Sequence, residues 1–330
     1  MKKKLNLTGL SLYLKYGYIP APYSIFENVY KLKLGHFLVL DQKENIEEFT
    51  YWKVEDYFLK GKEEKDKWLK RSEEELAQEL EEILTESFKL RLVSDVPVGM
   101  FLSGGIDSST VCALFSKEGI KLKTFTIGFY EKEYNEAEYA KKVAEYLGTE
   151  HTELYCTPKE AFEIIPKLPE IYDEPFGDSS AIPTYLVSRL AKSQVKVSLS
   201  ADGGDEQFCG YTRYWLIKDR IAKLSKIPFS NLLANTLDLI HPDLALKLYN
   251  AFKPVLPKYT NFRDIKLRNV LKAKDAMEKY DLAVSYFLEE DLKPLGIELS
   301  EKKDLEDWAL VDGLDPLASM MLLDLKILSS

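Results

Sequence analysis

The stretch VGMFLSGGIDSST, residues 98–110, joins a short apolar run, a polar loop and a second apolar run. The first run predicts a buried strand, and the second predicts a helix that reaches Lys117. Strands that alternate with helices of about a dozen residues are typical of βαβ units, whose strands form a parallel sheet. The sequence therefore predicts an α/β fold, a parallel twisted sheet flanked by helices. Its four strands are expected at 98–102, 121–129, 151–156 and 195–202. Helices are expected over 106–117, 135–147, 158–172 and 180–193.

The chain on either side of this pattern predicts different structures. Residues 1–57 hold an irregular stretch with two prolines and a β-hairpin over 36–52, which needs a larger body to pack against. From 216 to 330 the leucine-rich sequence predicts mostly helices. We therefore divide the chain into segments 1–57, 58–215 and 216–330, with the parallel sheet in the middle segment.

Two features mark the start of the middle segment. Residues 60–71 are nearly all charged and predict a linker. Ser72 and Glu75 then form the Ser-x-x-Glu pattern of a capping box, which predicts the start of a helix. Apolar residues at helical spacing follow, so this helix should present one apolar face to a core. They are Leu76, Leu80, Ile83, Leu84 and Phe88.

The composition excludes several classes of protein. A net charge of −9 argues against broad electrostatic binding to nucleic acid. The three cysteines lie far apart without a CxxC pair, which excludes a disulfide framework or a cysteine zinc site and suits a reducing cytoplasm. Asn6 and Thr8 interrupt the first apolar run too early for a secretory signal, and no stretch has the length of a membrane span. We therefore expect a cytoplasmic protein without nucleic-acid or membrane partners.

The loop after the first strand has the composition of an anion-binding site. Gly104 and Gly105 let backbone N–H groups approach a ligand closely, and the serines add hydroxyl donors. The helix that follows directs the positive end of its dipole into the loop. These features predict a phosphate or pyrophosphate site, although the spacing and the lysine of a Walker A loop are absent. Asp107 would repel phosphate unless a cation lies between them, so Mg²⁺ is implied.

A second glycine-containing loop follows the fourth strand and carries three carboxylates, Asp202, Asp205 and Glu206. Carboxylates this close repel one another unless a metal ion or a cationic group lies among them. Ligands of open parallel sheets bind at the carboxyl ends of the strands, so both loops should contribute to one site, with Asp107 and Asp205 on one Mg²⁺. The plainer alternatives are a tight strand-to-helix turn for the first loop and a solvated acidic turn for the second.

At these two loops the chain resembles a known enzyme family. SGGIDSS, residues 103–109, is similar to the PP-loop of ATP pyrophosphatases, which split ATP between its α- and β-phosphates. LSADGGDEQFCGYTRY, residues 199–214, resembles the matching segment of the glutamine-dependent asparagine synthetases. The resemblance implies a fold of the adenine nucleotide alpha-hydrolase type. It extends, in order and spacing, to LRLVSDVPVGMFLSGGIDSS, TFTIGF, NEAEYAKKVAEYLGTEHTE and DEPFGDSSAIPTYLVSRLAK.

The resemblance also implies a reaction. In that family the β-carboxylate of aspartate attacks the α-phosphate of MgATP, which gives β-aspartyl-AMP and pyrophosphate, and ammonia then displaces AMP. Asp202 and Glu206 are the implied catalytic residues, Asp202 in forming the acyl-adenylate, while Asp107 and Asp205 are the implied Mg²⁺ ligands. The residues implied to hold the nucleotide and its pyrophosphate are Leu102, Ser103, Gly104, Gly105, Asp107, Ser108, Ser109, Ile127, Ser200, Ala201 and Gly203.

Several departures from the family pattern bear on activity. Residues 1–57 resemble only the end of the glutaminase domain and its linker, and Lys2 stands where the family has its nucleophilic cysteine, so we expect no glutamine hydrolysis. The family's catalytic lysine should lie beyond Ser330, which predicts a fragment trimmed at both ends. Ala201 and Cys209 replace usual glycines of the second loop.

Other polar residues have plainer interpretations. His151 is expected at a strand edge rather than as a catalytic base, and Cys112 in the core. Cys209 has no visible partner that would make it a nucleophile, so packing is expected. For Arg213 and Tyr214 the sequence leaves open whether they contact substrate or pack.

Three functional interpretations remain at this stage. The first is an amide-forming synthetase that acts on aspartate, or on another carboxylate such as a sugar acid or the precursor of a β-lactam. The second is a different PP-loop enzyme, for example one that modifies tRNA. The third is a nucleotide-binding subunit without catalysis. The expected partners are small molecules: ATP, the acceptor and ammonia. A homodimer is compatible with each interpretation, and the sequence does not fix the oligomeric state.

Overall fold

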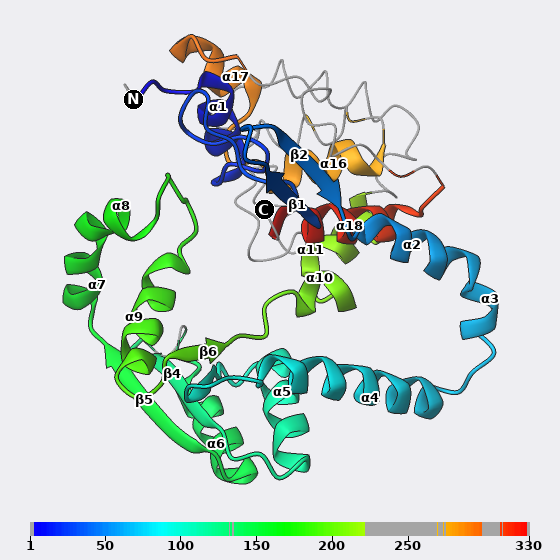
Figure 1. Ribbon diagram of the computed structural model, residues 1–330, viewed down its shortest axis with the longest axis vertical. Coiled ribbons are helices and arrows are strands. Elements are labelled where there is room, and N and C mark those ends of the chain that lie inside the picture. Colours follow the sequence, from blue (N-terminus) through cyan, green and yellow to red (C-terminus); the bar gives the residue numbers. More distant parts are fainter. Residues whose placement is uncertain are drawn as a thin grey trace, which may run out of the picture. The chain divides into compact units, whose positions relative to one another are not determined.

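The computed structural model describes residues 3–131, 133, 135–221, 269, 273, 275–298, 311 and 313–328. The chain forms two compact units (Figure 1). The first, which we call the helical unit, combines Met1–Lys62 with Asp205–Ser330, and the second, the sheet unit, is Glu63–Gly204. The helical unit is therefore built from both ends of the chain.

The sheet unit contains the four parallel strands that the sequence predicted. Their order is β5-β4-β3-β6, with β3 and β4 in the middle, so the predicted α/β fold is confirmed. Strand β3 precedes the loop at 103–109 and β6 precedes the acidic loop at 200–206. These two strands are neighbours in the sheet. The strands are β3 (Val98–Phe101), β4 (Lys123–Phe129), β5 (Glu150–Cys156) and β6 (Val197–Leu199).

Helices pack on both faces of this sheet. Successive residues of a strand point to opposite faces, and on β3 Met100 contributes to one apolar cluster while Phe101 packs against another. The first cluster is completed by Val111 and Phe115 on the helix after β3, and the second by Ala191. Both faces of the sheet are therefore covered, and the central strand β3, VGMF, contributes apolar side chains to both. The long helices of this unit are α4 (Glu73–Arg91), α5 (Ile106–Lys117), α6 (Ala137–Leu147) and α9 (Ala181–Lys192).

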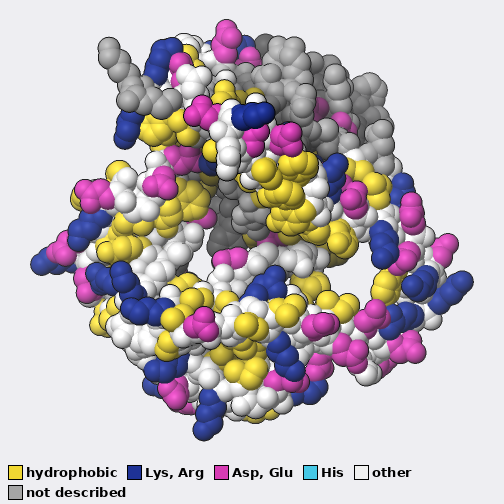
Figure 2. Space-filling view, in the orientation of Figure 1, with side chains coloured by type: hydrophobic (Ala, Val, Ile, Leu, Met, Phe, Trp, Pro, Cys, Tyr) yellow, Lys and Arg dark blue, Asp and Glu magenta, His cyan; other side chains and the backbone are white. Residues whose placement is uncertain are grey.

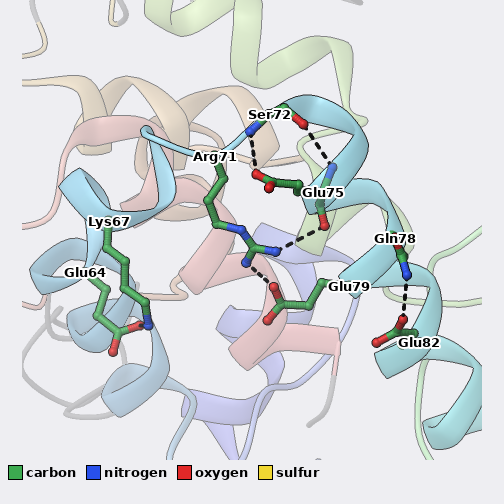
Figure 3. A network of polar contacts seen from close by, with 8 residues as sticks. All are labelled: Glu64, Lys67, Arg71, Ser72, Glu75, Gln78, Glu79 and Glu82. Carbon is green, nitrogen blue, oxygen red and sulfur yellow. Dashed lines mark hydrogen bonds and ion pairs between the residues drawn. The ribbon is translucent and has the colours of Figure 1, made fainter.

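The start of α4 confirms the capping-box prediction. Ser72 Oγ accepts a hydrogen bond from Glu75 N at 3.2 Å, and Ser72 N donates to the Glu75 carboxylate at 3.0 Å (Figure 3). Arg71 donates to Glu79 and to the Glu75 carbonyl oxygen, which ties the residue before the cap to the next turn. These local contacts explain why α4 begins where the sequence predicted, without help from distant parts of the chain.

The apolar face of α4 behaves differently from the prediction. Its C-terminal part packs on the sheet core, where Phe88 lies 6.0 Å from Phe115 between ring centroids. Leu80 and Ile83, one to two turns earlier, are 39% and 56% exposed. Figure 2 shows acidic and basic side chains gathered over the same helix, with apolar ones along one edge. The prediction of a single buried face is therefore confirmed only at the C-terminal end of α4.

Three further elements differ from the sequence-based expectation. The predicted linker over 60–71 is largely helical, since it contains the end of α2 (Val54–Glu63) and α3 (Lys65–Trp68). The helix expected over 158–172 is divided into α7 (Pro158–Ile164), η1 (Ile165–Lys167) and α8 (Leu168–Ile171). Its two internal prolines remove backbone donors, which explains the division. The fourth strand is shorter than predicted and ends at Leu199.

The helical unit contains the predicted hairpin. Strands β1 (His36–Leu40) and β2 (Ile46–Thr50) pair antiparallel, with Phe37 opposite Phe49. Helix α1 (Leu7–Tyr16) was not predicted. Lys15 Nζ and the Tyr16 hydroxyl of α1 both contact the Asp281 carboxylate, at 2.9 and 2.7 Å, which joins the two chain ends.

The C-terminal part of the helical unit is mostly helical among the residues that the structure describes. Its elements are α10 (Gly204–Phe208), α11 (Thr212–Trp215), η2 (Leu216–Ile221), α16 (Ala276–Val284), α17 (Glu289–Leu292), η3 (Lys293–Leu295) and α18 (Pro316–Leu328). The rest of the predicted helical segment, including 222–268, lies outside the described residues. Among the described residues, no helix has the length and apolar character needed to cross a membrane.

Candidate nucleotide-binding site

The loop between β3 and α5 is held by hydrogen bonds among its own serines. Ser108 Oγ, which is buried, accepts from Ser103 N at 3.2 Å and lies 3.0 Å from Ser103 Oγ. Gly105 N donates to Ser103 Oγ at 3.2 Å. The two serines thus close the loop across its base, and this fixes the direction in which α5 begins.

Gly104 occupies a position that excludes any other residue. Its φ of +81° lies in the left-handed region that favours glycine. A Cβ atom here would lie 2.5 Å from Ala140 N and 2.8 Å from the carbonyl carbon of Tyr139, both on α6. Glycine therefore lets the loop pass directly against α6, as the sequence analysis expected for a close backbone approach.

The same loop leaves donors at the N-terminus of α5. Gly105 is the N-cap residue, and no side chain caps the first turn. Within the described residues, Ser109 Oγ is buried without a hydrogen-bond partner. Buried polar atoms are nearly always paired, so an unpaired hydroxyl beside an uncapped twelve-residue helix indicates a ligand that accepts hydrogen bonds.

The second loop approaches the first at Asp107. A Cβ atom on Gly204 would lie 2.5 Å from Cγ and from Oδ2 of Asp107, so the carboxyl group rests against the Gly204 backbone. The preceding Gly203 has a φ of +93°, which again favours glycine. The structure therefore brings the Asp107 carboxyl to the end of the acidic loop, in line with the adjacency of β3 and β6.

The residues just before these glycines lie at the carboxyl end of β6. Ser200 Oγ donates to the exposed Asp202 carboxylate at 2.7 Å. Ala201 is partly buried and packs against the cluster of Met100 and Leu102. The methyl group that distinguishes Ala201 from the usual glycine thus contributes to the core.

Asp205 and Glu206 begin the helical unit, in the short helix α10. Glu206 is only 2% exposed and accepts a hydrogen bond from the Tyr211 hydroxyl. Burial and the neighbouring Glu206 carboxylate raise the pKa of Tyr211, so Tyr211 stays protonated and remains a donor. Asp205 and Glu206 are placed by the first turn of a helix, where the sequence analysis predicted a loop.

A comparison with known protein families agrees with this geometry. The family described as asparagine synthase matches residues 79–329, which include both loops. The chain belongs to the asparagine synthase family. Membership implies the use of ATP, and it agrees with the α/β fold of the sheet unit.

Three relatives show the range of that family. A Methanocaldococcus jannaschii protein, provisionally named glutamine-hydrolyzing asparagine synthetase 2, is 44% identical over 213 residues, 64% of this chain and 39% of the relative. The Bacillus subtilis glutamine-hydrolyzing asparagine synthetase 1 is 33% identical over 211 residues, 64% of this chain and 32% of the relative. The Gibberella zeae protein named amidase chry2 is 30% identical over 212 residues, 58% of this chain and 30% of the relative. This chain therefore spans well under half of these relatives.

Two of the expected nucleotide contacts have packed side chains. Leu102 is 1% exposed inside the β3 cluster, and its N–H donates to the Phe125 carbonyl oxygen at 2.9 Å. Ile127 packs against the cluster of Cys156 and Leu186 on the other side of β4. Their roles at the adenine therefore stay predictions.

The metal prediction rests on two carboxylates. Among the described residues no group of three or more metal-ligating side chains occurs, so a cation here would take part of its coordination from the phosphates. Asp107 fits this role because its carboxyl lies at the edge of the phosphate-type loop. The donor type also suits Mg²⁺, which prefers oxygen ligands.

The structure decides several plainer interpretations. Cys112 is fully buried, and His151 lies on the edge strand β5, as expected. Cys209 packs against the core of the helical unit, and its φ of +61° explains why the family has glycine there. Arg213 and Tyr214 pack rather than reach outward: both bind Asp324 of α18, at 2.6 and 2.5 Å. The sequence analysis did not identify Asp324 or the Tyr211–Glu206 pair. The partners of Asp324 are distant in sequence, and Tyr211 lies outside the helix that carries Glu206.

Proposed function

We propose that this chain is the ATP-using part of a carbon–nitrogen ligase that converts aspartate to asparagine. The observation that carries the proposal is the loop from Ser103 to Ser109, which places an uncapped helix N-terminus and an unpaired buried hydroxyl beside the Asp107 carboxyl. A site with these features is suited to pyrophosphate with a cation. Membership of the asparagine synthase family supports the amide-forming chemistry.

In the proposed reaction the β-carboxylate oxygen of aspartate forms a bond to the α-phosphorus of ATP, and pyrophosphate leaves with its bonding electrons. Ammonia then bonds to the carbonyl carbon of β-aspartyl-AMP, AMP leaves, and the nitrogen loses a proton. The loop residues would hold pyrophosphate in line for the first step. Asp202 would act at the acyl phosphate as it forms, and the buried Glu206 would contribute its carboxylate nearby.

Asp107 and Asp205 would hold Mg²⁺. When bound, the ion would neutralise charge that develops on the leaving pyrophosphate. The nucleotide contacts proposed for Leu102, Ile127, Ser200, Ala201 and Gly203 follow from their places at the carboxyl ends of β3, β4 and β6. Ammonia would normally come from glutamine through a separate domain.

A second acceptor is supported by the comparisons. The relatives named amidases, in Gibberella zeae and Penicillium rubens, are 30% and 32% identical to this chain. Those names are compatible with the same ATP chemistry on another carboxylate. A sugar acid or a β-lactam precursor would need the same loops and a different acceptor pocket, so the distinction lies in the acceptor alone.

The test is product identification with the full chain. We expect AMP and pyrophosphate from MgATP and ammonium only when aspartate is present. Asp202→Asn should abolish their formation while MgATP still binds, since the loop from Ser103 to Ser109 is unchanged.

Other outcomes select the alternatives. AMP that depends on a different carboxylate would replace aspartate as the acceptor. Tight MgATP binding without AMP from any acceptor would contradict the enzyme proposal and favour a nucleotide-binding subunit. Binding of RNA that weakens with added salt would favour a PP-loop enzyme of the tRNA-modifying kind.

A further inference from the structure

A line of directed contacts connects Asp324 of α18 to Glu206 of α10, all within the helical unit. We infer that this line positions the Glu206 carboxylate, with Tyr211, Arg213 and Asp324 as positioning residues. The inference rests on the proposed function for what Glu206 does, and on the contacts alone for how Glu206 is held.

The line begins at a buried carboxylate. Asp324 is 5% exposed and accepts from the Tyr214 hydroxyl at 2.5 Å, from Arg213 Nη2 at 2.6 Å and from the Tyr280 hydroxyl. A buried carboxylate is costly unless it is paired and hydrogen-bonded. Three donors from two other helices, α11 and α16, pair the Asp324 carboxylate. The same contacts hold the Arg213 side chain in one orientation.

Arg213, held in this orientation, stacks on the ring of Tyr211. Its Nε donates to the Tyr280 hydroxyl at 3.0 Å, so two separate atoms of the guanidinium are held by the buried cluster. The guanidinium carbon lies 3.6 Å from the centroid of the Tyr211 ring. A planar cation stacked this closely restricts the ring, and lysine could not reproduce the contact.

Tyr211 completes the line at Glu206. Its hydroxyl donates to Glu206 Oε1, and Glu206 is 2% exposed. The hydrogen bond fixes the orientation of the Glu206 carboxylate. The backbone around Tyr211 is independently held, because Gly210 N donates to the Asp205 carbonyl oxygen at 2.9 Å. Helix α18, more than a hundred residues later in the chain, therefore bears on the carboxylate next to Asp205.

The experiment measures how the Glu206 carboxylate is held. The full chain is labelled with ¹³C at the glutamate carboxyl carbon, and the Glu206→Gln variant identifies the Glu206 resonance. Tyr211→Phe removes only the donor, so the chemical shift of that resonance, measured at one fixed pH, should change. Asp324→Asn and Arg213→Lys should change it in the same direction by a smaller amount.

A double variant distinguishes a line of contacts from separate effects. If Asp324 acts through Tyr211, then Asp324→Asn combined with Tyr211→Phe should change the Glu206 chemical shift no further than Tyr211→Phe alone. Tyr16→Phe is the matched control, because the buried Tyr16 hydroxyl also donates to a carboxylate of this unit, at 2.7 Å, but outside the line. Its Glu206 resonance should keep the chemical shift of the unaltered chain.

Activity adds a second readout. Tyr211→Phe should lower kcat for AMP formation by about tenfold while KM for ATP changes less than twofold. An unchanged Glu206 chemical shift in a folded Tyr211→Phe or Asp324→Asn variant would overturn the inference. If the unaltered chain forms no AMP with any acceptor, the proposed function fails, and the NMR comparison still decides the positioning line.

Discussion

The two units of this chain are stabilised in different ways. The sheet unit has an apolar core, in which Met100, Val111 and Phe115 pack between β3 and α5. The core of the helical unit includes Asp324, whose carboxylate accepts hydrogen bonds from the hydroxyl groups of Tyr214 and Tyr280. Apolar burial has no preferred direction, whereas hydrogen bonds and ion pairs fix orientation. We conclude that the sheet unit is the tolerant scaffold and that the helical unit holds its carboxylates by directed contacts.

The buried polar atoms follow the same division. Among the described residues, the buried side-chain oxygens and nitrogens without a hydrogen-bond partner are Ser109 Oγ, His151 Nε2 and Ser198 Oγ. All three lie in the sheet unit. One of them, Ser109 Oγ, lies in the proposed pyrophosphate loop, where a ligand would supply the missing acceptor.

The largest expected effect comes from filling the space at Gly104. Gly104→Val should reduce AMP formation at least about 100-fold, since its branched side chain would displace the loop from α6 by an ångström or more. MgATP binding, measured by calorimetry, should weaken in parallel.

The matched control is Gly119→Val. Gly119 also has a positive φ, +73°, but a Cβ there would meet nothing within 4 Å. Both variants carry the backbone strain, so only the clash at Gly104 separates them. Equal activity in the two variants would contradict the proposed role of the loop.

The next effect tests the polar core. Asp324→Ala should lower the free energy of unfolding by about 3 kcal/mol, because it leaves Arg213 and two buried hydroxyl groups without their acceptor. We place the value at the low end for a broken buried pair because the Arg213 side chain is 37% exposed. Urea unfolding monitored by circular dichroism measures it.

A volume-conserving change in the other core provides the comparison. Met100→Leu, at a fully buried position of the sheet-unit core, should cost less than about 1.5 kcal/mol, since an apolar core tolerates changes that keep volume and pattern. If Met100→Leu cost as much as Asp324→Ala, the two cores would not differ in the way we infer.

This contrast also explains what the sequence could predict. Strand and helix periodicity identified β3, α5, β4, α6 and β5 within a few residues, because each is a local apolar pattern facing one common core. The loop from Ser103 to Ser109 could be predicted equally well, since its glycines and serines come directly after strand β3 in the sequence. Helix α1 was missed because its buried face is not a row of aliphatic side chains: it includes Gly9, Ser11 and Tyr16 beside Leu12.

The parts that escaped prediction depend on contacts that a local apolar pattern does not show. Asp324 looks like an ordinary surface aspartate until α18 is placed against α11 and α16, and the role of Tyr211 depends on its contacts with Glu206 and Arg213. Two internal prolines of 158–172, Pro166 and Pro169, were present in the sequence but were given too little weight against the apolar pattern. Local signals therefore predicted the scaffold, and tertiary contacts decide how the acidic residues are held.

A smaller effect is expected from the local signal that begins α4. Ser72→Ala should lower the free energy of unfolding of the sheet unit by about 1 kcal/mol, because Glu75 N loses its acceptor. Ser72→Gly should cost only a few tenths of that value, since glycine is tolerated at N-caps. Thermal unfolding of both variants measures the difference, and equal losses would mean that the Ser72 hydroxyl does not cap the helix.

The smallest effect concerns His151 and the pH dependence of stability. Its Nδ1 lies 2.9 Å from Thr124 Oγ1, and its buried Nε2 has no partner among the described residues. Burial lowers the pKa of His151, while the neighbouring Glu153 and Glu145 oppose this shift and Lys141 adds to it. The folded chain therefore favours neutral histidine, and the unfolded chain binds the proton more readily.

The sign of the effect follows from that preference. Stability from the neutral His151 is present above the unfolded pKa, about 6.5 for histidine, and is lost as the pH falls from there toward the lower folded pKa. The unaltered chain should thus lose more stability between pH 7.5 and 5 than His151→Gln does, by comparison of urea midpoints. Carboxylates titrate in both proteins and cancel in the difference. An equal loss in the two proteins would show that burial in the sheet unit does not lower the pKa of His151.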